Sequence, residues 1–242
     1  MRPFIQAKGD MPGNVNFSAA YWGFAEMGFE CVLFRSIEEL DASSRGDVVV
    51  GGLGPVRHAL VSRGVRIEEF DYPDELRSYM GRRTWSSAMD EVAADCSMRP
   101  VFVKPVEDKR FTGKTVACIG DLTGLGTSGY TPSVTCSEVV DFRAEWRCFV
   151  RYGDILDVRP YKGDWRLSFD PAVIEGAVAA YETAPAGYAA DFGVTHDGRT
   201  LLVEVNDGYS LGCYGLQHNL YAQLLAARWA ELTETPDECD FR

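Results

Sequence analysis

The strongest constraint on the fold is an Asp-Gly turn at 197–198 between two apolar segments, YAADFGVT and TLLVEVN. An Asp-Gly pair between such segments is among the clearest short-range signals for a β-hairpin. A two-residue turn at this point places Asp191 directly opposite Glu204, with their Cβ atoms about 5 Å apart. Side chains alternate along a strand, so Asn206 shares the face of Glu204. The hairpin is therefore predicted to carry an oxygen-rich cluster.

Two opposed carboxylates destabilise a sheet unless something neutralises them. Oxygen ligands without His or Cys suit a hard cation, and Mg²⁺ accepts two or three protein oxygens when phosphates and water supply the rest. The alternative is a solvated polar face, although apolar residues flank both acids. We expect Asp191, Glu204 and Asn206 to be metal ligands.

A second hairpin is predicted over residues 137–162, with its turn at Gly153-Asp154. This turn sets Glu145 opposite Lys162 and leaves Arg147 on the same face. Arg147 offers a guanidinium fork for a phosphate or carboxylate, and Lys162 offers a point charge. An ordinary cross-strand salt bridge is the alternative interpretation.

Lysine is used sparingly, because 19 of the 24 cationic residues are Arg. Three of the five Lys cluster within 104–114. Lys104 ends the apolar strand VFVKP, so its ammonium must emerge at a polar site or reach the surface along its own aliphatic stem. Lys109 and Lys114 follow in EDKRFTGK, where a Lys beside a Gly-containing loop is one way to hold phosphates.

Composition excludes several classes of function. The net charge of −12 lacks the positive footprint expected for binding nucleic acid or an anionic membrane. No stretch approaches the roughly 20 apolar residues that cross a bilayer, and no signal peptide is recognisable. Seven cysteines form no CxxC pair, and an odd number argues against a secreted disulfide framework. We expect a soluble, cytoplasmic protein of one large or two small domains.

The order of elements predicts an α/β (α+β) protein. Short apolar runs alternate with helical patterns over the first 80 residues, as in βαβ units around a small parallel sheet. Helical spacing from Trp85 to Cys96 predicts a helix there. Asp170 and Pro171 supply an N-cap and a first-turn Pro for another helix, and a last helix covers about 221–232.

The sequence around the candidate motifs for dinucleotide binding and for nucleophilic catalysis does not support either function. The segment GLGTSG at 124–129 matches GxGxxG but opens no helix, so the dinucleotide-binding interpretation is rejected. The three His residues, His58, His196 and His218, are scattered, and the sequence pairs none of them with a Ser or Cys nucleophile. We expect these His residues to be structural or exposed.

The ordered set FVKP, FTGK, SEVVDF, EWRCFV, ADFGVT and EVN resembles the ATP-grasp superfamily over about residues 80–225. More narrowly, it is similar to a compact bacterial and phage clade distinguished by an Arg and two Lys. EWRCFV and EVN also resemble the ribosomal-protein glutamate ligases. The resemblance implies an ATP-grasp fold, with a short N-terminal βαβ domain at 1–80 and an ATP-grasp domain at 81–242.

The resemblance implies ATP and Mg²⁺ as cofactors, with Asp191, Glu204 and Asn206 on the metal. Arg147, together with Arg159 or Lys162, would face the γ-phosphate or an acyl-phosphate. The resemblance also implies which other residues would contact the nucleotide. Lys104 would meet the α-phosphate, Lys109 the β side, Thr112 and Gly113 the loop over the phosphates, Glu138, Val139 and Val140 the adenine, and Glu145 the ribose.

The family's reaction joins a carboxylate to an amine through an acyl-phosphate, with ADP and phosphate as products. Partners would be small-molecule or peptide carboxylates and amines, with neither nucleic acid nor membrane, and the oligomeric state is left open. After EVN the chain continues DGYSLGCYGL where the glutamate ligases have a Pro-Gly loop, so their substrate does not transfer. A phosphotransferase and a nucleotide-binding module without turnover are the alternatives.

Overall fold

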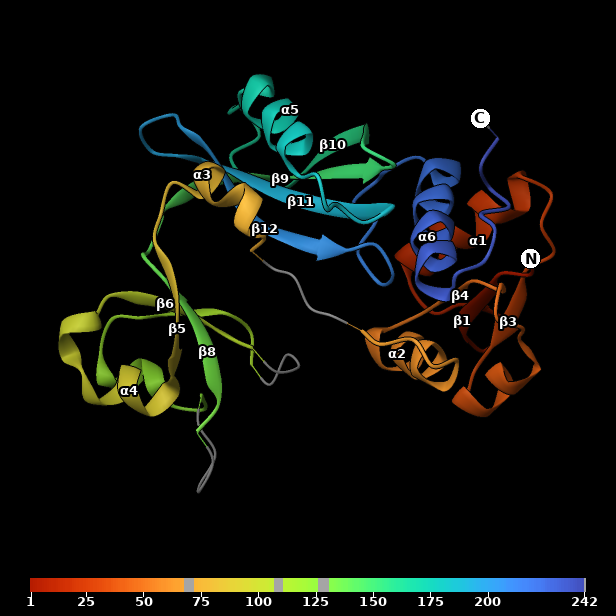
Figure 1. Cartoon of the computed structure of the whole chain (residues 1–242), viewed down its shortest axis with the longest axis horizontal. Helices are drawn as coiled ribbons and strands as arrows, with labels where there is room; N and C mark the ends of the chain where they lie inside the picture. The colour runs from red at the N-terminus through yellow and green to blue at the C-terminus, as the bar shows by residue number, and fades with distance from the viewer. Residues whose placement is uncertain (68–71, 107–110, 126–130, 242) are drawn as a thin grey trace. The chain divides into compact units, whose positions relative to one another are not determined.

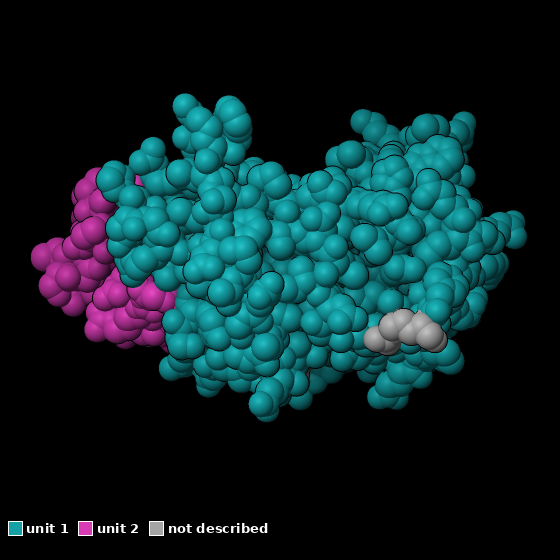
Figure 2. Space-filling view, turned by 90° about the horizontal axis from the view of Figure 1, so that it is seen from above, with its two compact units in different colours: residues 1–79, 142–242 teal, residues 80–141 magenta. Residues whose placement is uncertain are grey.

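The chain packs into two compact units, as seen in a computed structural model that describes residues 1–67, 72–106, 111–125 and 131–241. Unit 1 comprises residues 1–79 and 142–242, and unit 2 comprises residues 80–141 (Figure 2). Lys109 and most of the GLGTSG motif lie outside the described residues. No helix in the described ranges is long and apolar enough to cross a membrane.

The N-terminal part of unit 1 is a small sheet built on β1, and it confirms the predicted βαβ arrangement. β3 and β4 each pair parallel with β1, and β2 pairs antiparallel with it (Figure 1). The elements are β1 (Phe4–Lys8), β2 (Met11–Pro12), α1 (Val15–Glu26), β3 (Val32–Phe34), η1 (Ile37–Ala42), β4 (Val49–Val50) and α2 (Leu53–Ser62).

The larger sheet of unit 1 is antiparallel, with strand order β10-β9-β11-β12 (Figure 1). Its strands are β9 (Phe142–Arg151), β10 (Asp154–Gly163), β11 (Gly187–Thr195) and β12 (Thr200–Asp207). Helix α5 (Pro171–Ala180) begins as predicted, since the Asp170 carboxylate accepts the N–H of Ala172 and Pro171 is the first helical residue. Helix α6 (His218–Thr233) closes the unit.

One hydrophobic core joins the first and last segments of the chain. It includes Phe4 and Phe24 from the N-terminal part, Phe149 from β9, and Tyr221 and Trp229 from α6. Helices α1 and α6 pack directly against each other. The N-terminal sheet therefore folds together with the end of the chain, and the division at 80/81 into two domains stays a prediction.

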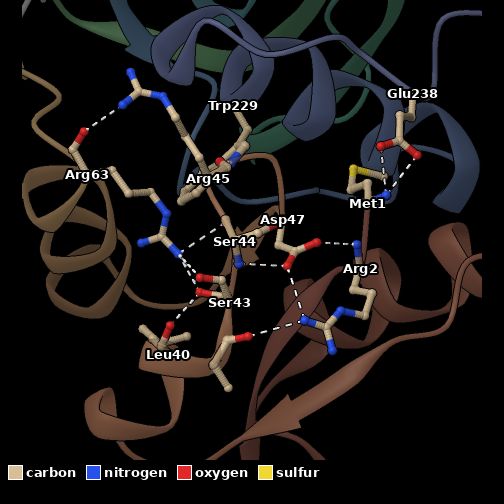
Figure 3. Close-up of polar contacts among 11 residues, drawn as sticks. Met1, Arg2, Leu40, Ser43, Ser44, Arg45, Asp47, Arg63, Trp229 and Glu238 are labelled. Carbon is tan, nitrogen blue, oxygen red and sulfur yellow. Dashed lines mark hydrogen bonds and ion pairs between the residues drawn. The ribbon is translucent and has the colours of Figure 1, made fainter.

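A buried carboxylate anchors the loop before β4 (Figure 3). Asp47 accepts the backbone N–H of Arg2 at 2.6 Å and of Ser44 at 2.8 Å. Burial acts to raise the pKa of Asp47, but these bonds lower it below its usual value. The indole N–H of Trp229 donates to the carbonyl of Arg45 at 3.1 Å. These bonds fasten the N-terminal sheet to α6.

Unit 2 contains a four-stranded sheet with order β5-β8-β6-β7. The predicted helix starting at Trp85 is wrong over its first turn, because Thr84–Ala88 pairs with Ser133–Ser137 and forms β5. Long-range pairing overrides the local helical spacing there. The elements near and within this unit are η2 (Asp74–Leu76), α3 (Arg77–Met80), β5, α4 (Met89–Ala94), η3 (Cys96–Met98), β6 (Val101–Pro105), β7 (Lys114–Val116), η4 (Ile119–Leu122) and β8 (Ser133–Ser137).

Gly23 sets how closely α1 approaches α6. A Cβ at this position would lie 2.0 Å from the carbonyl oxygen of His218 and 2.9 Å from the Cβ of Ala222. We expect Gly23→Ala to lower the free energy of unfolding by about 1–3 kcal/mol, as overpacking does in a tight core. Urea denaturation checks this. Gly46→Ala is the matched control, because its Cβ would meet only ordinary contacts at 3.7–3.8 Å. Equal unfolding midpoints for both variants would contradict the account.

Candidate functional site

The β9/β10 hairpin turns one residue earlier than predicted. The two-residue turn is Tyr152-Gly153, whose φ values of 50° and 82° match a turn that needs left-handed backbone at both positions. Register shifts between Ile155 and Asp157 and between Pro160 and Lys162 then advance β10 against β9. As a result Lys162 lies opposite Glu145, as predicted, although the turn itself was wrong.

The second bulge, at Tyr161, brings two consecutive side chains to one carboxylate. The hydroxyl of Tyr161 donates to Oε2 of Glu145 at 2.7 Å, and Nζ of Lys162 donates to Oε1 at 2.5 Å. Glu145 is only 6% exposed. Burial, and then the neighbouring negative charges, raise the pKa of Tyr161, so it remains a hydrogen-bond donor. Sequence reasoning missed Tyr161, because strict alternation puts it on the other face.

The β11/β12 hairpin also reaches the predicted pairing by a different route. Its loop has three residues, 196–198, closed by the bond from the N–H of Thr195 to the carbonyl of Arg199 at 3.0 Å. The hydroxyl of Thr195 accepts the N–H of Arg199 and bonds Asp197, which stabilises this longer turn. A register shift next to Asp191 compensates, so Asp191 lies opposite Glu204 as predicted.

Arg147 and Asp191 form the centre of the site. Nε of Arg147 donates to Oδ1 of Asp191 and Nη2 donates to Oδ2, both at 2.7 Å. The two residues are 7% and 2% exposed. Burial acts to lower the pKa of Arg147, but the bonds to Asp191 raise it, so the guanidinium stays charged. The pair is a desolvated, bidentate ion pair.

Asn206 and Glu204 complete this cluster on β12. The Nδ2 amide of Asn206 donates to Oδ2 of Asp191 at 3.2 Å and to Oε1 of Glu204 at 3.3 Å. Three side chains that carry oxygen ligands are thus within reach of one point, as the hairpin register predicted. The described residues contain no group of three His, Cys, Asp or Glu that could hold a metal ion, and the third side chain of this cluster is an amide. Two carboxylates and an amide fit a hard cation whose other ligands are phosphate and water oxygens.

Two tyrosines cover the guanidinium of Arg147. The ring of Tyr214 lies 4.8 Å from the guanidinium carbon and that of Tyr161 lies 5.9 Å from it. The two rings stack on each other, with centroids 5.1 Å apart and 27° between their planes. Tyr214 is 45% exposed and has a φ of 41°, which is unusual for a bulky residue. It lies in the DGYSLGCYGL segment, and no motif in the sequence marked it.

Arg159 lies directly opposite Arg147 and pairs with Asp157, with Nε and Oδ2 2.7 Å apart. Arg147, Arg159 and Lys162 therefore belong to one polar patch on the β9 and β10 strands. Further along the same face of β9, Phe149 enters the shared core. One face of the sheet is thus apolar at one end, where it joins the core with α6, and polar at the other.

Lys104, one of the predicted phosphate contacts, belongs to unit 2. Lys104 is half-buried on β6 opposite Thr135, and it alternates with the buried residues Val103 and Pro105. Its ammonium therefore leaves the sheet on the face away from the core of unit 2. The prediction of a Lys emerging from an apolar strand is consistent with this position.

The predicted phosphate-loop residues, Thr112 and Gly113, lie just before β7, and the predicted adenine contacts lie after β8. Thr112 is exposed, and Gly113 lies so close to Phe102 that a Cβ would meet the ring at 2.5 Å. Glu138, Val139 and Val140 lie in the connection from β8 to β9. The carboxylate of Glu138 accepts the N–H of Arg83 at 2.9 Å, and its own N–H donates to the carbonyl of Arg83 at 3.1 Å.

Comparison with known families identifies the family of this chain. A family model described as the ATP-grasp domain, R2K clade family 2, matches residues 79–224. The chain belongs to this ATP-grasp family. The matched range contains every residue that the sequence assigned to the nucleotide, the metal and the reacting phosphate. No curated protein matches the chain.

Solved structures share the ATP-grasp fold along nearly the whole chain. A RimK-domain ATP-grasp protein from Sphaerobacter thermophilus has a TM-score of 0.61 at 16% identity and covers 93% of this chain and 99% of its own. The macrocyclase MdnC from Microcystis aeruginosa, bound with precursor peptide MdnA, has a TM-score of 0.54 at 15% identity, with 93% and 99% covered. D-alanine–D-alanine ligase from Bacillus anthracis, complexed with ATP, has a TM-score of 0.53 at 14% identity, with 96% and 97% covered. The predicted α/β ATP-grasp fold is confirmed.

The Tyr161 hydroxyl should contribute measurably to the stability of this ATP-grasp protein. We expect Tyr161→Phe to lower the free energy of unfolding by about 1–2 kcal/mol, because a buried carboxylate loses a hydrogen bond. Tyr214→Phe is the control, since its ring also stacks and its hydroxyl has no hydrogen bond within the described part of the chain. Urea denaturation of both variants measures the difference. Equal losses would show that the Glu145 contact adds nothing.

Proposed function

We propose that this protein is an ATP- and Mg²⁺-dependent carboxylate–amine ligase that works through an acyl-phosphate. The observation that carries the proposal is the cluster of Arg147, Asp191, Glu204 and Asn206 on two adjacent hairpins. It combines oxygen groups that could bind a cation with a guanidinium, and phosphoryl transfer depends on such positive charges around the transferred group. Membership of the ATP-grasp family supports ATP as the nucleotide.

In this proposal Asp191, Glu204 and Asn206 hold Mg²⁺. The metal would neutralise charge on the phosphates of ATP. Lys104 and Lys109 would contact the α- and β-phosphates, and Thr112 and Gly113 would form the loop over them. Adenine would meet the backbone of 138–140, and the ribose hydroxyls would bond Glu145, whose carboxylate Tyr161 and Lys162 already orient.

The reaction begins when a substrate carboxylate oxygen attacks the γ-phosphorus and the bond to the β-phosphate oxygen breaks, releasing ADP. The amine nitrogen then attacks the acyl carbon, the bond to the phosphate oxygen breaks, and the nitrogen loses a proton. Arg147, with Arg159 or Lys162, would stabilise the negative charge on the transferred group. Positioning and charge neutralisation account for catalysis, so no side-chain nucleophile is needed.

The substrates would be small-molecule or peptide carboxylates and amines. MdnC was solved with a precursor peptide, and the ATP-grasp ligase PsnB with a minimal precursor, Mg and ADP. D-alanine–D-alanine ligase acts on a small amino acid. The net charge of −12 favours a cationic amine over an anionic one.

Glu204→Gln tests the metal assignment. The variant keeps the shape of the side chain but removes a negative ligand, so we expect more than about tenfold weaker binding of AMP-PNP with Mg²⁺. Isothermal titration with and without Mg²⁺ measures this. Glu182→Gln, at an exposed carboxylate of the same unit, should match wild type. If Glu204→Gln binds as wild type does, Glu204 is not a metal ligand.

Lys104→Ala tests the phosphate assignment in unit 2. Loss of a charge-assisted hydrogen bond should weaken AMP-PNP binding by about 10–100-fold. Lys8→Ala is the control, because this exposed Lys at the end of β1 lies in unit 1 and has no assigned contact with the nucleotide. Unchanged affinity in Lys104→Ala would leave this Lys a surface role only.

The reaction class is tested by ADP release from wild type with panels of carboxylates and amines. The ligase proposal expects ADP release that requires a carboxylate and an amide product that requires the amine. A stable phosphorylated product that forms without an amine would identify a phosphotransferase instead.

A further inference from the structure

Both carboxylate oxygens of Asp191 are already engaged by donors from its own chain. Oδ1 accepts from Nε of Arg147, and Oδ2 accepts from both Nη2 of Arg147 and Nδ2 of Asn206. Oε1 of Glu204 also accepts from Asn206. A guanidinium thus supplies one positive charge against the two opposed carboxylates, and it does so at Asp191, which the proposed function makes a metal ligand.

The guanidinium is held in this position from several sides. The rings of Tyr161 and Tyr214 lie over it, and β9 itself is buried between β10 and β11. A divalent cation at Asp191 would lie close to this fixed positive charge, where little water screens the repulsion. A metal ion without phosphates would therefore meet that repulsion with only the two carboxylates to offset it.

We propose that Arg147 is a specificity-determining residue that makes the metal site of this chain take up its cation only together with nucleotide phosphates. The inference rests on the proposed function of the site. Phosphate oxygens give the guanidinium fork a second anionic partner and offset its repulsion of the cation. Asn206 turns its amide so that the oxygen, rather than Nδ2, faces the carboxylates. Free Mg²⁺ brings no anionic partner for the guanidinium and nothing that offsets its repulsion, so the site excludes the free ion.

Mn²⁺ binding to the full chain without nucleotide tests the proposal, with electron paramagnetic resonance counting the free ion. Wild type should bind Mn²⁺ weakly. Arg147→Gln removes the charge but keeps an amide donor for Asp191, and should bind Mn²⁺ at least about tenfold more tightly. Arg147→Lys keeps a positive charge and should remain close to wild type. Glu204→Gln added to Arg147→Gln should abolish the gain.

Arg228 provides a matched control. It makes the same two-point contact with Asp207, at 2.7 Å for each bond, at the end of β12. Arg228→Gln should not increase Mn²⁺ affinity. A gain as large as that of Arg147→Gln would show that any buried carboxylate released from an Arg collects Mn²⁺, and would overturn the proposal.

The Mn²⁺ affinity of wild type can also overturn the proposal. If wild type binds Mn²⁺ without nucleotide as tightly as Arg147→Gln, in a manner that Glu204→Gln removes, the metal assignment stands and the role of Arg147 is wrong. If Glu204→Gln changes neither Mn²⁺ binding nor Mg²⁺-dependent AMP-PNP binding, the proposed metal site itself is wrong.

If the Arg147→Gln variant does not fold, NMR of wild type tests the proposal instead. In ¹⁵N-labelled wild type, the Nε–H signal of Arg147 is identified by its loss in Arg147→Lys. It should keep its position on adding Mg²⁺ alone and move on adding Mg²⁺ with AMP-PNP. A shift with Mg²⁺ alone would contradict the proposal.

Discussion

Strand β9 is the central constraint of this protein, because it is buried over Ala144–Arg151 yet carries charged side chains within that stretch. Each buried charge needs a partner, since a buried ion left alone costs about 3–5 kcal/mol. Glu145 is paired by Lys162, Arg147 by Asp191, and Arg151 by Asp237. The partners come from β10, β11 and the C-terminal segment. The strands around β9 must therefore assemble in one register to neutralise it.

That requirement explains why irregularities in the hairpins matter for the site. In each hairpin the turn and the bulges together bring the required pair opposite each other. Bulges commonly re-aim side chains next to functional sites. At Tyr161 the bulge does more, because it adds a hydroxyl to Glu145 and a ring beside Arg147. The polar patch is thus built by departures from regular strands as much as by the strands.

The same charges that stabilise the sheet would also serve the chemistry of an ATP-grasp ligase. In the proposed function, the guanidinium that pairs with Asp191 would also meet a phosphate of the nucleotide. The aromatic cover from Tyr214 comes from the segment where this chain departs from the glutamate ligases. Arg147 therefore neutralises Asp191 in the structure and would recognise phosphate in the proposed reaction.

Local patterns were enough to predict the N-cap at Asp170 and the βαβ units. The predicted pairing of Asp191 with Glu204 is also present, but through a three-residue loop and a register shift that the sequence did not predict. Local patterns failed where distant segments decide the outcome. Trp85 follows helical spacing but pairs with β8, and the N-terminal sheet shares its core with α6. Tyr161 and Tyr214 are 53 residues apart in number and meet only because β10 and the segment after β12 fold onto the same guanidinium.

The sequence by itself determined which polar groups share a strand face, because side-chain alternation along β9 and β12 places carboxylates, an amide and a guanidinium on chosen faces. Only the tertiary structure decided that Arg147 binds Asp191, that Tyr161 bonds Glu145 and that two rings cover the guanidinium. These contacts depend on bulges and on packing between segments far apart in the chain. Local propensity does not specify these contacts, because the charges on β9 become buried, and so need partners, only when all the strands have assembled.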